Sequence, residues 1–160
     1  MPQRHLVAVA LIATLLGPAP ALAGVKVRFV NPEHYTDADS SGSGTEVTLA
    51  VFRAYLETLG RRLLAPGQDL SIDVLDIDLA GEYQPRGRGT EVRVLRAVTP
   101  PRFRLRYVLS EKGRRMRSGE DVLSNIDYQM NPAAGVSSDR FVYEKALLDD
   151  WFRRVVGSRQ

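Results

Sequence analysis

The sequence predicts an α+β protein, with a mostly antiparallel sheet of four to five strands and two helices packed on one face. Three observations predict this fold. Apolar residues alternate in several segments, they recur at three and four residues in two others, and the order is strand, helix, strands, hairpin, helix. The 160 residues include no cysteine, so core packing has to stabilise the fold without disulfides.

Residues 1–23 have the three parts of a cleavable export signal. Arg4 supplies positive charge, Leu6 to Leu16 form an apolar run, and Ala21-Leu22-Ala23 has the small-x-small pattern of a cleavage site. The run is about half of the roughly 20 residues that span a bilayer, so it does not predict a transmembrane helix. We expect cleavage after Ala23, a single α+β domain over residues 24–160, and no transmembrane segment after cleavage.

The first strand and the first helix follow the signal. Residues 25–30 alternate apolar and basic side chains, which is typical of a half-buried strand. Apolar residues then recur at helical spacing from Val47 to Leu63, and Ala65-Pro66-Gly67 ends the predicted helix.

The second strand is predicted over Asp69 to Ala80. Its apolar residues change phase between Val74 and Leu75, so we expect a β-bulge that returns apolar side chains to the core. Three acidic residues of this strand then share the opposite face: Asp73, Asp76 and Asp78.

The second half of the chain predicts a hairpin and a helix. Gly81 to Gly89 is predicted as a polar turn, and Glu91 to Ala97 as a short strand. Arg102 to Glu111 alternates clearly, and a tight turn at Lys112-Gly113 leads into the return strand, which places Leu109 opposite Met116. The last helix is predicted from about Asp139 to Val156.

Two residues of the last helix are predicted to be structural. Trp151 lies on its apolar face and is expected in the core. Glu144 lies at the border of that face, and a buried Glu144 needs a cation such as Arg102.

Opposite charges are segregated along the chain. Asn31 to Glu82 contains ten acidic and three basic residues, and Arg86 to Arg117 contains eleven basic and two acidic ones. Either the two segments lie together and neutralise each other, or the basic one faces an anionic partner. The candidate binding residues are Arg102, Arg104, Arg106, Asp76 and Asp78.

The sequence lacks the motifs of the common catalytic and cofactor sites. His34 is the one histidine after the signal, and no serine sits in a G-x-S-x-G elbow, so we expect no metal, no cofactor and no catalytic triad. Alternation separates the aromatic residues of the Arg102 to Glu111 strand from its arginines, which argues against nucleic-acid binding.

Motifs spread over the chain after the signal resemble a known family. They are Asn31-Pro32-Glu33-x-Tyr35-Thr36-Asp37, Asp76-x-Asp78-Leu79-Ala80-Gly81-Glu82, Pro101-Arg102-x-x-Leu105-x-Tyr107, Ser118-Gly119-Glu120, Tyr143-Glu144-Lys145 and Trp151-Phe152. The chain resembles the small exported proteobacterial proteins catalogued as domain of unknown function 3016. The resemblance implies a periplasmic protein and implies nothing about activity.

We therefore expect a periplasmic, non-enzymatic binding or accessory domain. Its expected partner is an anionic lipid, lipopolysaccharide or an envelope protein. One alternative is a carboxylate-dependent hydrolase that uses Asp76 and Asp78 with Glu82 or Glu120. Another is a stand-alone structural stress protein with no dedicated ligand.

Overall fold

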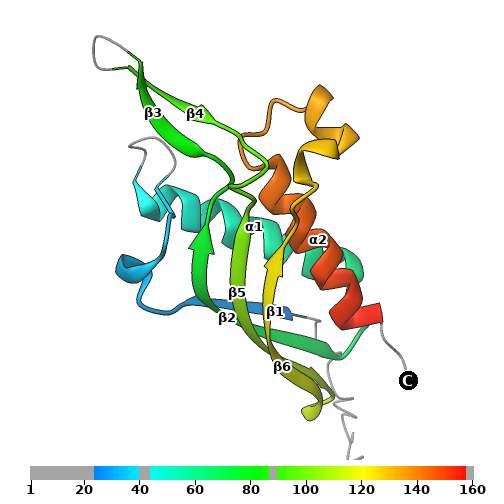
Figure 1. Ribbon diagram of the computed structural model, residues 1–160. Helices are drawn as coiled ribbons and strands as arrows, with labels where there is room; N and C mark the ends of the chain where they lie inside the picture. Colours follow the sequence, from blue (N-terminus) through cyan, green and yellow to red (C-terminus); the bar gives the residue numbers. More distant parts are fainter. Residues whose placement is uncertain (1–23, 40–43, 87–89, 158–160) are drawn as a thin grey trace, which may run out of the picture.

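The computed structural model describes residues 24–39, 44–86 and 90–157 (Figure 1). Their elements, in chain order, are β1 (Gly24–Phe29), η1 (Pro32–His34), α1 (Thr45–Leu63), β2 (Gln68–Asp78), β3 (Glu82–Arg86), β4 (Thr90–Val94), β5 (Arg102–Glu111), β6 (Arg114–Ser124), η2 (Tyr128–Met130), η3 (Pro132–Val136) and α2 (Val142–Gly157). The predicted signal, residues 1–23, lies outside the described residues.

The main sheet has four strands in the order β1-β2-β5-β6. β2 pairs antiparallel with β5, and β5 pairs antiparallel with β6, whereas β1 lies parallel to β2. The predicted α+β class is confirmed, and the sheet is mixed because α1 connects β1 to β2. A helical crossover returns the chain to the end of the sheet from which it started, so the two strands run in the same direction.

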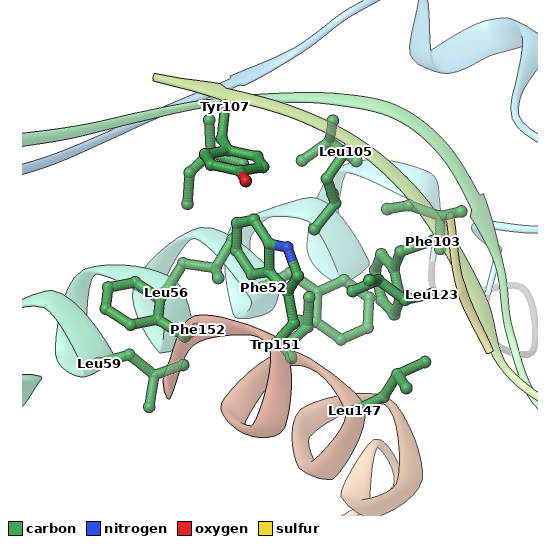
Figure 2. Close-up of a cluster of buried hydrophobic side chains, with 14 of the residues drawn as sticks. Phe52, Leu56, Leu59, Phe103, Leu105, Tyr107, Leu123, Leu147, Trp151 and Phe152 are labelled. Carbon is green, nitrogen blue, oxygen red and sulfur yellow. The ribbon is translucent and has the colours of Figure 1, made fainter. Parts of the chain in front are cut away.

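Both helices bury their apolar faces in one core on the same side of the sheet. α1 packs against β1, and α2 packs against α1 and lies over β5 and β6. Figure 2 shows Trp151 of α2 and Phe52 of α1 directed toward the side chains of β5. Trp151 is 1% exposed, and its ring meets that of Tyr107 edge-on at 5.7 Å, so the predicted core position is confirmed.

Two local predictions of backbone geometry are confirmed and one pairing is wrong. The register of β2 against β5 shifts between Val74 and Asp76, as the phase change predicted. Lys112 (φ 50°) and Gly113 (φ 76°) both have the positive φ that a type I′ hairpin turn requires. Leu109, however, lies opposite Arg117 and not Met116, because a second register shift follows Leu109.

The predicted polar turn between Gly81 and Gly89 is also wrong in part. Residues 82–86 form β3, which pairs antiparallel with β4 in a separate two-stranded sheet that projects from the body (Figure 1). Gly81 (φ 82°) is required at its base, because an added Cβ would lie 2.7 Å from the Val94 carbonyl oxygen.

Candidate functional site

The face of the main sheet opposite the helices brings the predicted binding residues together. β2 and β5 are neighbours, so their outward side chains form a row of carboxylates beside a row of guanidinium groups. The paired positions are Asp78 and Arg102, Asp76 and Arg104, and Asp73 and Arg106. The acidic and basic segments of the sequence therefore lie side by side on this face.

Two of the three arginines in this row have a carboxylate partner. Arg102 lies 3.6 Å from Asp78, and Arg106 lies 3.0 Å from Glu120 on β6. Arg104 has no ion pair within the described residues. The carboxylate of Asp76, which lies opposite it, accepts hydrogen bonds from the Thr36 N–H at 2.8 Å and the Thr36 hydroxyl at 3.0 Å. The row is largely neutralised from within the sheet.

The carboxylates of β2 differ in electrostatic environment. Asp73 accepts two hydrogen bonds from Arg28, at 2.9 and 2.7 Å, and this contact lowers the pKa of the carboxyl group. Burial raises the pKa of Asp78 in spite of the attraction of Arg102, and it also raises the pKa of Asp37.

A groove of about 470 Å³ lies at the end of this face, near the base of the β3–β4 hairpin. Asp78, Glu82 and Arg102 line it, together with the exposed side chains of Val98 and Val122. Neither Asp76 nor Glu120 lines this groove, so the four carboxylates of the hydrolase alternative do not share it.

A second groove, of about 670 Å³, lies between α2 and the loop that precedes it. Two of its carboxylates already have cationic partners. Asp139 lies 2.5 Å from Lys145, and Asp149 lies 3.2 Å from Arg62 and 2.6 Å from Arg153.

The β5–β6 hairpin carries a set of basic side chains that differ from the paired row. We call it the basic tip, and it consists of Lys112, Arg114, Arg115 and Arg117. All four are exposed, and no ion pair within the described residues involves any of them. The sequence places them in the basic segment, but the predicted binding surface is the Arg102 to Arg106 row, because apolar and basic residues alternate more clearly there.

The basic tip is held in place at two points. The Lys112 N–H donates to the Gly67 carbonyl at 2.8 Å, which fixes the turn against the segment after α1. The Arg117 guanidinium donates to the Arg154 carbonyl in the last turn of α2 at 3.3 Å, where a cation also complements the helix dipole.

Glu144 is fully buried at the start of α2, where it meets the base of the β3–β4 hairpin. Its Oε1 accepts hydrogen bonds from the Ala80 N–H and from the Arg93 guanidinium, both at 2.9 Å, while its Oε2 has no partner within the described residues. Arg93 also donates to the Ala80 carbonyl. The predicted need for a cation is met, but Arg102 is the wrong residue, because Arg93 comes from a hairpin that the sequence did not predict as such.

The described residues show neither a metal-binding cluster nor a membrane-spanning helix. Among the described residues, no three His, Asp or Glu side chains come together in a group that could hold a metal ion. Within the same ranges, none of the helices has the length and apolar character needed to cross a bilayer.

Comparison with known proteins gives one family match. A family model described as protein of unknown function (DUF3016) matches residues 23–154. No curated protein matches the chain. A solved structure described as a minor lipoprotein from Acinetobacter baumannii is similar at 10% identity and a TM-score of 0.24, over 83% of this chain and 88% of that chain. A likeness at this TM-score supports no inference about fold or function.

Proposed function

Since the chain belongs to the DUF3016 family, whose description assigns no activity, we propose a function from its own surface: it is a non-enzymatic periplasmic protein that binds an anionic component of the cell envelope. The basic tip is the proposed binding surface. The Arg102 to Arg106 row, which the sequence predicted, is the second candidate surface.

The proposal rests on a contrast between the cations of the sheet face and those of the basic tip. On the sheet face, Arg102 and Arg106 have carboxylates within 4 Å, and such exposed pairs leave little net charge to attract a ligand. At the basic tip, four exposed cations have no ion pair within the described residues. Glu111 precedes them in the hairpin, and Glu120 and Asp121 line a groove with Arg117 alone of the four. Unpaired charges of one sign attract a partner of the opposite sign and raise its rate of association.

Charge-removing variants at the two surfaces test the proposal. Arg114→Gln/Arg115→Gln and Arg102→Gln/Arg106→Gln lower the net charge equally, so they are matched controls for each other. On immobilised heparin, used as a generic polyanion, we expect the Arg114/Arg115 variant to elute at distinctly lower salt than the Arg102/Arg106 variant. The reverse order would assign binding to the row. Equal elution of both variants would show that only net charge matters, and it would refute a defined surface.

A hydrolase remains the second candidate, because Asp78 and Glu82 line one groove and burial raises the pKa of Asp78. A raised carboxyl pKa is a property of general acids. If this reading holds, Asp78→Asn and Glu82→Gln each abolish a glycan- or ester-hydrolysing activity without loss of stability. Wild-type protein inactive on such substrates would exclude it.

A further inference from the structure

We propose that the anionic partner is a lipid surface, and that the protein docks on it end-on, with the basic tip among the headgroups and the Met116 side chain inserted between them. This inference rests on the proposed function and specifies the partner and the orientation. Its evidence comes from the composition of the tip, the exposure of Met116 and the position of the tip in the fold.

The composition of the tip matches what an anionic membrane surface attracts. A run of six residues, Lys112 to Arg117, contains four cations, one turn glycine and one methionine. Basic residues close to an anionic bilayer each increase binding about fivefold, and the effect falls off within a Debye length. Four cations on one hairpin can act together on a surface, whereas a compact soluble anion contacts only some of them.

Met116 supplies an apolar group in the middle of these cations. It is 55% exposed, and it lies in the first half of β6, where residues 114–118 are all exposed. It also lies at the shift in register between β5 and β6, where the strand opposite Leu109 and Ser110 has one extra residue. A flexible apolar side chain surrounded by basic residues is typical of segments that insert at the interface of anionic membranes.

The position of the tip favours end-on docking. Figure 1 shows the β5–β6 turn at one end of the molecule and the β3–β4 hairpin at the other. The start of β1 lies at the same end as the tip, because Gly24 pairs with Asp69, Asp69 with Ser110, and Ser110 with Arg115 across the sheet. The predicted export signal therefore joins the fold at the end that carries the basic tip. Predicted cleavage after Ala23 adds the α-amino group of Gly24 to the positive charge there.

Vesicle binding tests the inference with the protein as isolated after export. The probes are vesicles of phosphatidylcholine with and without phosphatidylglycerol. We expect binding only to the anionic vesicles and its loss in high salt. Relative to wild type, Arg114→Gln/Arg115→Gln should lower the partition coefficient about 25-fold. Arg102→Gln/Arg106→Gln, with the same change of net charge, should lower it only a few-fold.

The insertion of Met116 has its own readout. Met116→Ser should lower the partition coefficient about tenfold, since burial of a methionine side chain contributes roughly that much. In Met116→Trp, the fluorescence should shift to the blue on anionic vesicles and be quenched by brominated lipid. Val122→Trp is the matched control, because Val122 is an exposed residue (64%) on the same strand, and we expect no shift there. The native Trp151 is buried and gives a constant background.

The outcomes separate this inference from the proposed function. If heparin binding depends on the basic tip but anionic vesicles are not bound, the membrane inference is wrong and the proposed function stands. If vesicles are bound but the tryptophan at position 116 does not shift, the end-on insertion is wrong. Binding to neither probe would overturn both proposals.

Discussion

At the scale of single residues, Glu144 and Arg93 form the most deeply buried ion pair among the described residues. It joins α2 to the base of the β3–β4 hairpin and to the backbone of Ala80. The Glu144 side chain is 0% exposed, and that of Arg93 is 15% exposed, so neither charge is well solvated. Each residue therefore depends on the other for its charge to be tolerated inside the protein.

We expect Arg93→Met to lower the free energy of unfolding by about 3–5 kcal/mol, because it leaves the carboxylate of Glu144 buried without a cation. Denaturant titration measures the change. Arg96→Met removes an exposed arginine from the segment that follows β4 and should change stability by less than about 0.5 kcal/mol. Equal losses in the two variants would show that the buried pair has no special role.

Asp73 predicts a pH dependence of stability. The hydrogen bonds from Arg28 lower its pKa in the folded protein, so the carboxylate stabilises the fold fully above the ordinary aspartate pKa of about 3.9. That stabilisation is lost as the pH falls from there through the lower folded pKa. The Tm of Asp73→Asn should therefore fall less than that of wild type over this range.

The control for this prediction is Asp69→Asn. Asp69 is an exposed residue on the same strand and has no ion pair within the described residues. Its variant should follow the acid sensitivity of the wild type. If Asp73→Asn also follows the wild type, the contact with Arg28 contributes nothing to the pH dependence.

At the scale of secondary-structure elements, the approach of α1 to β1 depends on one glycine. Gly60 is buried in the helix, and a Cβ at this position would lie 2.2 Å from Cγ2 of Val25. The glycine therefore lets the helix pack closely on the edge strand of the sheet.

We expect Gly60→Ala to destabilise the protein by about 1–3 kcal/mol through overpacking, although alanine normally favours a helix by about 1 kcal/mol over glycine. Thermal unfolding measures the change. The double variant Gly60→Ala/Val25→Ala should regain part of the loss, because the clashing methyl group is gone. A more stable Gly60→Ala protein would show that the helix can shift without cost.

The helices, strands and turns differ in how well their sequence patterns predict them. The helix stripes, the bulge after Val74 and the turn at Lys112-Gly113 all leave a local signature, and each is confirmed. β3 leaves no signature that favours a strand, because its five residues include a proline, which cannot donate to a strand ladder. The cation that pairs with Glu144 was misassigned for the same reason, since Arg93 lies on that hairpin.

At the scale of the whole molecule, charge is distributed in two ways. The sheet face neutralises most of its cations with the aspartates of β2 and with Glu120, whereas the basic tip does not. The two helices end near the tip end of the fold, where Lys112 contacts the segment after α1 and Arg117 contacts the last turn of α2. The basic tip can bind an envelope component only if the protein is exported.

Export and processing are therefore the prediction at this scale. Mass spectrometry of the protein recovered from the periplasm should give Gly24 as its first residue. Ala23→Phe should block cleavage, because the site needs a small side chain there, while Leu22→Phe at the unconstrained position should be processed normally. Recovery of the protein in the cytosol with residues 1–23 retained would contradict the export prediction.

The sequence by itself determined the α+β class, which side chains face the core and how charge is segregated along the chain. Each of these follows from the periodicity or the composition of a single segment. Only the tertiary structure decided which charges meet. Strand order and register place Arg102 beside Asp78 and leave the basic tip without an ion pair in the described chain. Such pairings join residues far apart in sequence, and their energies are too small and too dependent on geometry to be inferred before the strands are placed.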